Sequence, residues 1–347
     1  MISKKMNPLV QNNSVIRVMF EEGKRLAAIY GAENVYDFSI GSPSIAPPAA
    51  AQEAAERLMK EMPPTQLHAY APAPGMASVR EKVAAYLTDT FGEVYRAQDI
   101  YMTDGASSAL AILTRALMGP GDEAIVFAPY FPEYAVYAEA AGGSVRVVPC
   151  RADTFALDLD ALAAAVTEKT ALLILNSPNN PSGAVYSAET LRQMADMLLQ
   201  KEKEFGHEIW LISDEPYREI AFDGHQVPYV SLYYPRTISC YSFSKSLSVP
   251  GERIGYVAVN PESGVSAMLV NMCGQISRGI GHNCPSSVIQ LAAADCCDLT
   301  SDLSVYETNM NILYDALTDL GFDIVRPGGT FYLFPKALED DAAAFSK

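Results

Sequence analysis

Apolar residues recur at helical spacing over many segments of this chain. In the first segment, residues 14–31, Met19, Phe20, Leu26 and Ala27 fall on one side of a helix, and Gly31 supplies a C-terminal stop. The same spacing predicts further helices at residues 49–61, 76–91, 106–118, 132–141, 158–166, 187–204, 264–277 and 300–320. Much of the chain is therefore predicted to be helical.

Short apolar runs lie between most of these helices. They predict strands at residues 123–128, 144–148, 171–175, 209–213, 237–241 and 254–259, and a last strand at 330–334 after a Pro-Gly-Gly turn. Strands that alternate with helices indicate a mostly parallel sheet covered on both faces. The predicted fold class is α/β, and ligands of such sheets bind at the carboxyl ends of the strands.

Composition and charge narrow the function classes. The 347 residues are 49% hydrophobic, enough for a sizeable core, and the formal net charge is −16. Nucleic acid or an anionic membrane would need a basic face. No apolar run reaches the ~18 residues of a transmembrane helix, and the first twenty residues lack the pattern of a signal peptide. We expect a cytoplasmic protein without a nucleic-acid or membrane partner.

Cysteines and histidines form no metal-binding pattern. The six cysteines are scattered without a CxxC pair, so we expect free thiols in a reducing compartment. The four histidines never fall in a metal spacing such as HExxH. No metal site is predicted.

The most informative stretch is residues 242–256, SFSKSLSVPGERIGY. It places Lys245 between serine hydroxyls and puts Arg253 eight residues further on. A lysine that must lose a proton and attack a carbonyl benefits from a cationic neighbour and a partly dry site. Hydroxyls and a guanidinium together form a phosphate clamp. The combination indicates a Schiff-base lysine for pyridoxal phosphate (PLP), whereas the alternative is a serine-rich turn before a surface arginine.

Other polar clusters follow predicted strands. Asp214, at the end of a buried strand, needs a partner for its charge, and a protonated pyridine nitrogen would serve. Tyr217 is three residues away, within reach of a ring oxygen. Asn180, in a turn with two X-Pro bonds, offers an amide to a phenolate oxygen. If a phosphate binds here, the helix start at residues 103–110 is an anion site; the alternative is an ordinary capped helix. Phe131 could likewise stack on a flat ring, and its alternative is a place in the core.

Together these motifs resemble the class I/II aminotransferases, the fold type I PLP enzymes related to aspartate aminotransferase. The resemblance runs from about residue 41 to 334. It implies that Lys245 forms the Schiff base and moves a proton between substrate and cofactor. It also implies that Asp214 pairs with the pyridine nitrogen and that Phe131 stacks on the ring. Asn180 and Tyr217 would bond the ring oxygen, and the phosphate would be held by Gly105, Ala106, Ser107, Ser242 and Arg253.

The resemblance also suggests partners and a substrate site. Tyr70 matches a tyrosine that reaches the phosphate of a neighbouring subunit, which implies a homodimer with shared active sites. Gly41, together with Asn180, would lie near the substrate. Arg278 matches only loosely an arginine that binds a side-chain carboxylate and would favour aspartate or glutamate. We favour the alternative for Arg278, a surface or interface arginine.

The C-terminus departs from the family pattern. Family members continue for some tens of residues past the 330–334 strand and carry there an arginine for the substrate α-carboxylate, so we expect a truncated chain with an incomplete small domain. The expected domains are an N-terminal arm of the small domain (1–48), a large PLP-binding domain (49–300) and the small domain (301–347). Loss of that arginine should lower activity.

Three functions stay open. The first is an aminotransferase that moves an amino group between an L-amino acid and a 2-oxo acid by a ping-pong mechanism, with aspartate or glutamate and 2-oxoglutarate as candidate substrates. The second is a PLP-dependent carbon–sulfur lyase on the same scaffold. The third is a truncated PLP-binding protein with little activity.

Overall fold

The computed structural model describes residues 15–38 and 40–345. Its contacts separate two units, Met1–Ser42 and Pro43–Lys347. Within the first unit, helix α2 (Val15–Tyr30) ends immediately before Gly31, and the 3₁₀ turn η1 (Ala32–Asn34) follows. The predicted domain limits, 1–48, 49–300 and 301–347, stay a prediction.

The second unit is built on a seven-stranded sheet with the order β1-β7-β6-β5-β4-β2-β3. The strands are β1 (Ile100–Thr103), β2 (Glu123–Ala128), β3 (Ser144–Pro149), β4 (Thr170–Asn176), β5 (Trp210–Asp214), β6 (Thr237–Ser242) and β7 (Gly255–Val259). The pairs from β3 to β6 are parallel, and β7 is antiparallel to both of its neighbours. The sheet is therefore mostly parallel, as the alternation of strands and helices predicts.

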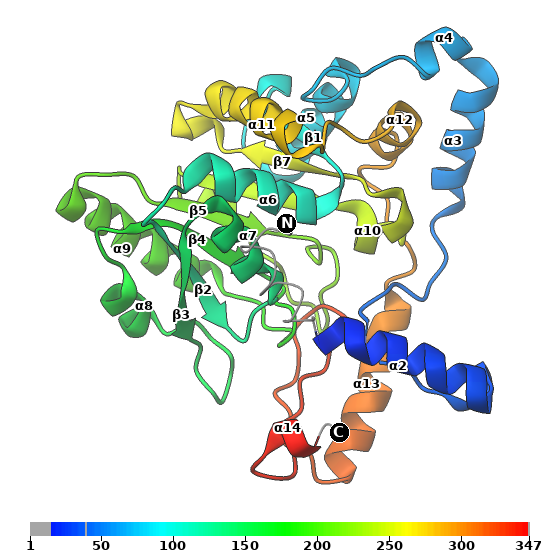
Figure 1. The fold of residues 1–347 in the computed structure, drawn as a ribbon, viewed down its shortest axis with the longest axis vertical. Coiled ribbons are helices and arrows are strands. Elements are labelled where there is room, and N and C mark those ends of the chain that lie inside the picture. The colour runs from blue at the N-terminus through cyan, green and yellow to red at the C-terminus, as the bar shows by residue number, and fades with distance from the viewer. Residues whose placement is uncertain (1–14, 39, 346–347) are drawn as a thin grey trace, which may run out of the picture. The chain divides into compact units, whose positions relative to one another are not determined.

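Some helices of this unit cover the sheet, whereas others, such as the last two, lie away from it (Figure 1). The helices are α3 (Ala49–Glu61), α4 (Pro64–Leu67), α5 (Ala77–Phe91), α6 (Gly105–Leu117), α7 (Glu133–Ala141), α8 (Leu159–Ala165), α9 (Ala188–Phe205), α10 (Phe243–Ser246), α11 (Ser266–Ile280), α12 (Ser287–Ala294), α13 (Ser304–Asp319) and α14 (Ala342–Phe345). The 3₁₀ turns η2 (Ala97–Asp99), η3 (Val230–Leu232), η4 (Pro250–Glu252) and η5 (Pro261–Ser263) lie in connections. No described helix is long and apolar enough to cross a membrane.

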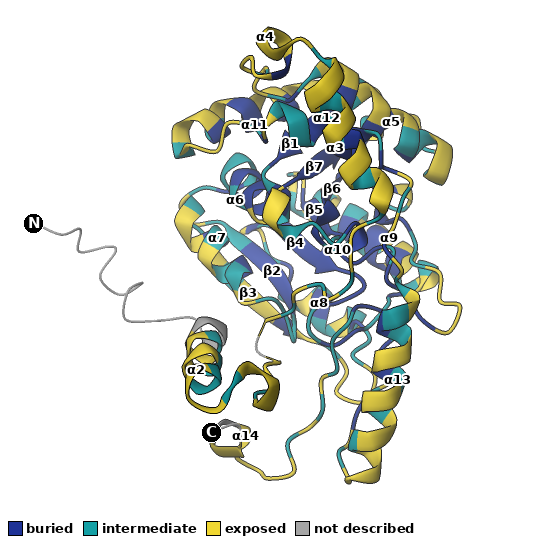
Figure 2. Ribbon diagram, turned by 90° about the vertical axis from the view of Figure 1, so that its right-hand side faces the viewer, coloured by how far each residue is buried: buried dark blue, intermediate teal, exposed yellow. Residues whose placement is uncertain are grey.

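Alternation along each strand sends side chains to two separate cores. Ile174 and Ile212 pack in one cluster with residues of α6, α7 and α11. Their neighbours Leu173 and Leu211 pack in another cluster with residues of α8 and α9. In Figure 2 these central strands are coloured as buried, with helices on both sides of them. The predicted α/β fold, a sheet covered by helices on both faces, is confirmed, because both faces of the strands are apolar and must be buried.

Local signals set the helix ends as well. In α9, the Ser187 side chain accepts a hydrogen bond from the Thr190 backbone N–H, and Gly206, at φ 75°, closes the helix. Leu191, Met194 and Leu198 form the buried stripe between these ends. A capped start, a glycine stop and a stripe at helical spacing explain why this element is predicted almost residue for residue.

The predicted strand at 330–334 is wrong. Only isolated bridges occur there, from Ala221 to Gly329 and from Ile324 to Pro335. Thr330 has φ 65°, a left-handed conformation that interrupts an extended run. Phe331 and the following aromatic residue pack into a separate cluster rather than into a sheet.

The sequence did not predict β1 or the short helices α4, α10, α12 and α14, and β1 and α12 illustrate why. The strand β1 has only four residues and pairs antiparallel with β7. Helix α12 is a short alanine-rich segment whose cap, Ser286, accepts a bond from the Ile289 backbone N–H. Both are too short to show a clear period. The other predicted strands, from β2 to β7, are confirmed to within one residue at either end.

Candidate active site

The carboxyl ends of neighbouring strands bring the predicted polar residues together. Asn176 ends β4, Asp214 ends β5 and Ser242 ends β6. In the sheet register, Asp214 is paired with Asn176 on one side and with Cys240 on the other. Because parallel strands end at the same edge, residues from distant parts of the sequence meet there.

Asp214 is the central acidic group of this edge. Ile212 and Trp210, two and four residues before it, point into the cluster that α6 and α7 cover, so the strand period turns Asp214 to the same face. Its side chain is buried, and Tyr134 Oη donates a hydrogen bond of 2.6 Å to Oδ2. The other oxygen, Oδ1, is buried without a hydrogen-bond partner. Burial raises the pKa of Asp214 to about 7, against a smaller lowering by the Tyr134 bond.

Amide and phenol groups form a network beside this carboxylate. Asn176 Nδ2 donates to the Asp214 backbone oxygen at 2.8 Å, and the Asn180 N–H donates to Asn176 Oδ1 at 2.6 Å. Asn180 Nδ2 in turn lies 3.5 Å from Tyr217 Oη, and the hydroxyls of Tyr217 and Tyr332 are 2.9 Å apart. The predicted Asn180 and Tyr217 are thus held in mutual contact.

Lys245 follows β6 on the short helix α10. Ser242 begins this helix, because its Oγ accepts a hydrogen bond from the Ser244 N–H. Lys245 Nζ lies 5.2 Å from the centre of the Phe331 ring and 6.0 Å from that of Tyr217. Burial, and secondly the positive charge of Arg253, lower the pKa of Lys245 to about 8. The amine is therefore partly unprotonated near neutral pH, as a nucleophile requires.

Arg253 faces the start of α6. It has φ 53°, and its guanidinium donates to the backbone oxygens of Asp104 and Pro250 at 3.2 and 3.0 Å. Gly105, at φ 78°, makes this close approach possible, since a Cβ there would stand 2.7 Å from Arg253 Nη2. A guanidinium against free N–H groups at a helix start is a favourable place for an anion.

The remaining predicted phosphate ligands lie around this point. Ala106 and Ser107 follow Gly105 in the first turn of α6, and Ser107 is exposed. Ser242 is buried and donates to Ser244 Oγ at 2.8 Å. Their roles stay predictions.

Phe131 lies two residues before the first residue of α7. Its ring is partly exposed and meets the ring of Tyr134 edge-on, with centroids 5.7 Å apart. Phe131 is thus adjacent to the residue that bonds Asp214, on the sheet face to which Asp214 points.

Two predicted residues, Tyr70 and Arg278, are not brought into this cluster. The side chain of Tyr70 is fully exposed. Arg278, in the last turn of α11, is exposed and donates to Gln275 Oε1 at 3.0 Å, which fits the surface reading. Gly41 belongs to the separate unit Met1–Ser42. Substrate roles for Gly41 and Arg278 stay predictions.

Sequence analysis missed three side chains of the cluster, namely Tyr134, Phe331 and Tyr332. Tyr134 is the second residue of α7, where an apolar spacing predicts only packing. Phe331 and Tyr332 were assigned to a strand instead. The available signal was the run of three aromatics at residues 331, 332 and 334 after a Gly-Gly turn, which places large rings beside a flexible turn.

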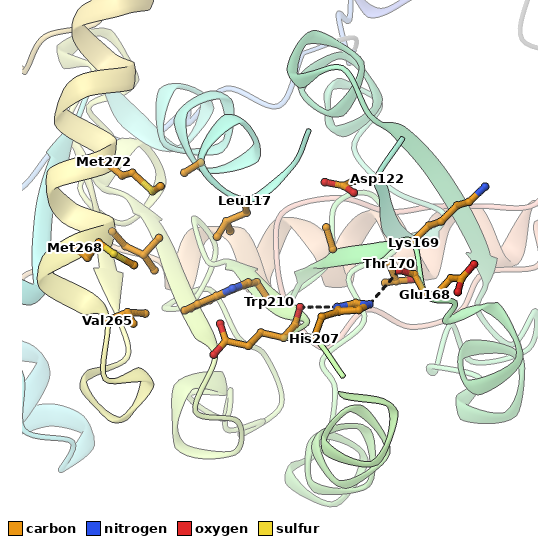
Figure 3. Close-up of a pocket in the computed structure, with 14 residues that line it drawn as sticks. Leu117, Asp122, Glu168, Lys169, Thr170, His207, Trp210, Val265, Met268 and Met272 are labelled. Carbon is orange, nitrogen blue, oxygen red and sulfur yellow. Dashed lines mark hydrogen bonds between the residues drawn. The ribbon is translucent and has the colours of Figure 1, made fainter. Parts of the chain in front are cut away.

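A different pocket, of about 480 Å³, opens at the opposite edge of the sheet, where β4 and β5 begin (Figure 3). The His207 ring nitrogens lie 3.1 and 3.0 Å from the backbone oxygens of Glu208 and Glu168. The pocket contains none of the predicted site residues. Among the described residues, no group of His, Cys, Asp and Glu is placed to hold a metal ion.

Comparison with known proteins identifies the family. The sequence model of the family "Aminotransferase class I and II" matches residues 32–347. An aspartate aminotransferase of Geobacillus stearothermophilus is 30% identical over 335 residues, 93% of this chain and 80% of that protein. An aromatic-amino-acid aminotransferase of Thermococcus litoralis is 30% identical over 337 residues, which is 94% of this chain and 81% of its own length.

Solved structures agree with this assignment. A crystal structure of an amino transferase from Eubacterium rectale has 45% sequence identity and a TM-score of 0.95, covering 99% of this chain and 87% of the other. The aspartate aminotransferase of Thermus thermophilus with maleate has a TM-score of 0.85 at 25% identity, covering 99% and 88%. The fold is therefore that of the aspartate aminotransferases, and the chain belongs to the class I and II aminotransferases.

Proposed function

We propose that this aminotransferase uses PLP, held at the carboxyl edge of the sheet and attached to Lys245. Two features of this edge carry the proposal. Asp214 is a buried acid with one oxygen that lacks a hydrogen-bond partner, and Lys245 has a lowered pKa. Asp214 Oδ1 has no partner, and a protonated pyridine nitrogen would satisfy it. Lys245 has a pKa of about 8, which suits attack on an aldehyde.

The residues on this edge fit the rest of the cofactor as well. Gly105 and Arg253, with Ala106, Ser107 and Ser242, would hold the phosphate at the start of α6. Asn180 and Tyr217 would donate to the ring oxygen, and Phe131 would lie against the ring. When bound, PLP supplies an aldehyde and an electron-withdrawing ring that stabilises negative charge at the substrate Cα.

The protein's own groups would then do the acid–base work. Lys245 Nζ would take the proton from the substrate Cα and return it later, which requires an amine that is partly neutral near pH 8. Asp214 would keep its negative charge beside a protonated ring nitrogen, because a cation near a buried carboxylate favours the ionised form. The aromatic wall of Tyr217 and Phe331 keeps water away from the lysine.

We further propose an L-amino acid and a 2-oxo acid as substrates, with aspartate or glutamate and 2-oxoglutarate as the first pair to test. The transfer would run in two half-reactions. The names of several relatives as aspartate aminotransferases support an acidic donor. A homodimer in the cytoplasm is part of the same proposal, with Tyr70 serving the site of the second subunit.

A donor panel tests this function. Purified protein with PLP is mixed with each amino acid alone, and the cofactor spectrum and the 2-oxo acid formed are followed, with Lys245→Ala as control. We expect one equivalent of 2-oxo acid per site, with further turnover only after a 2-oxo acid acceptor is added. Continuous release of pyruvate and ammonia from a cysteine conjugate without any acceptor would instead identify a carbon–sulfur lyase and overturn the proposal.

A further inference from the structure

The hydroxyl of Tyr134 is fixed against the buried carboxylate of Asp214. The donor–acceptor distance from Oη to Asp214 Oδ2 is 2.6 Å, and both residues are at least nine-tenths buried. The bond joins α7 to β5 across 80 residues of sequence. A short bond from a neutral donor to a carboxylate is of the strong, charge-assisted kind.

The ring of Tyr134 has little freedom to move away. It is stacked on Tyr130, with centroids 6.4 Å apart and planes 12° apart. Phe131 meets it edge-on, and the ring belongs to the apolar cluster between α6, α7 and the sheet. The hydroxyl is therefore held in place by packing before any ligand binds.

The bond also decides which carboxylate oxygen is available. Oδ2 is occupied by Tyr134, and Oδ1 is buried without a partner. Other polar side chains also lie near Asp214, but among the described residues none of them donates a hydrogen bond to its carboxylate; they are Glu215, Tyr137, Tyr217 and Cys240. One bond thus orients the carboxylate and leaves a single oxygen for a ligand.

We propose that Tyr134 is a positioning residue, which keeps Asp214 ionised through Oδ2 and turns Oδ1 toward the ring nitrogen of PLP. The inference rests on the proposed PLP site. Its consequence is that Tyr134, through its bond to Asp214, controls the protonation of the ring nitrogen.

The test replaces the hydroxyl alone, by Tyr134→Phe, and uses PLP labelled with ¹⁵N in the ring. Wild type should show the ¹⁵N shift of a protonated ring nitrogen, and Tyr134→Phe a shift toward the unprotonated form. PLP should also bind about tenfold more weakly or worse, because a hydrogen bond to a charged group is lost. The matched control is Tyr186→Phe, a buried tyrosine in the cluster on the other face of the sheet, which should change neither reading.

A double-mutant cycle separates positioning from packing. If Tyr134 acts through Asp214, then Tyr134→Phe with Asp214→Ala binds PLP as weakly as Asp214→Ala alone. Additive losses, or a Tyr134→Phe protein with an unchanged ¹⁵N shift and PLP affinity, would overturn the inference. Thermal unfolding checks that each variant is folded, and the Tyr134→His variant retains a ring N–H donor if Tyr134→Phe does not fold. A wild type that binds no PLP would refute the proposed function itself, so the two failures are distinguishable.

Discussion

Burial shifts the pKa values of the two central side chains, Asp214 and Lys245, in opposite directions. The pKa of Asp214 rises to about 7, and the pKa of Lys245 falls to about 8. In both cases the apolar surroundings disfavour the charged form. The site without its cofactor is therefore less stable than it would be with neutral residues, and a ligand that carries the complementary groups relieves this cost.

Asp214→Asn tests this on the cofactor-free protein. The folded-state pKa of about 7 lies above the ordinary 3.8, so between about pH 4 and 7 the folded state holds a proton that the unfolded state releases. Asp214 therefore lowers stability as the pH rises through this window. Relative to wild type, the free energy of unfolding of Asp214→Asn should increase by on the order of 2–4 kcal/mol from pH 4 to pH 8.

Denaturant unfolding at several pH values measures this difference. The control is Asp196→Asn, the same substitution on the exposed face of α9. A parallel pH response of wild type and Asp214→Asn would show that Asp214 is not the buried, neutralised acid that we describe.

Gly105→Ala tests the close approach of Arg253. The added Cβ would stand 2.7 Å from Arg253 Nη2, and the residue has φ 78°, so both contact and backbone are strained. We expect a loss of about 1–2 kcal/mol in stability and weaker PLP binding, because the guanidinium must move. Gly92→Ala, at φ 81° with open space around it, isolates the backbone part. PLP binding equally reduced in both variants would contradict a specific role for the Gly105 contact.

At the scale of elements, the turn after β4 supports the aromatic wall of the site. The N–H groups of Gly328 and Gly329 both donate to the Gly183 backbone oxygen, at 2.9 and 3.1 Å. The Thr330 N–H donates to Ile220 at 3.0 Å. These bonds anchor the segment from which Phe331 and Tyr332 reach Lys245 and Tyr217.

Gly183→Ala should displace this segment. A Cβ there would overlap Pro327 and lie 3.0 Å from the Gly329 oxygen, at a φ of 71°. We expect a stability loss of about 2 kcal/mol or more and faster bleaching of the bound cofactor by solvent nucleophiles. Gly264→Ala, at φ 72° in open space, serves as the control. If hydroxylamine reacted with both proteins at the wild-type rate, the segment would not protect the lysine.

The elements also show where sequence reasoning succeeds and where it ends. Long helices and apolar strands such as β4 and β5 have local periods, and the Lys245 to Arg253 motif is contiguous, so both were predictable. The bond between Tyr134 and Asp214 joins residues 80 positions apart, and no local pattern encodes it. The 330–334 segment has strand-like composition, but the left-handed Thr330 and contacts with Tyr217 and Tyr306 decide its path.

At the scale of the whole molecule, the site collects residues from most of the chain length between β1 and the 327–332 segment. The exposed Tyr70 adds a further prediction, a shared site in a homodimer. In a mixed dimer of Lys245→Ala and Tyr70→Ala chains, one site would contain neither substitution and the other would contain both.

This arrangement predicts complementation. Each variant alone should bind PLP poorly, whereas the purified mixed dimer should bind about one PLP per dimer with wild-type affinity. Equilibrium dialysis of tagged mixed dimers counts the bound PLP. Tyr36 is another exposed tyrosine, so a Tyr36→Ala chain paired with the Lys245→Ala chain serves as the control. A mixed dimer that binds no PLP tightly would show that Tyr70 does not complete the partner's site.

The attachment of PLP to Lys245 is the central claim, and one measurement tests it directly. Protein incubated with PLP is reduced with borohydride, which makes the lysine–cofactor bond permanent, and its peptides are analysed by mass spectrometry. We predict the cofactor mass on the peptide that contains Lys245, together with a visible absorption band before reduction that Lys245→Ala lacks. A label on another lysine would contradict the account. So would the absence of any label together with an absorption band that Lys245→Ala retains unchanged.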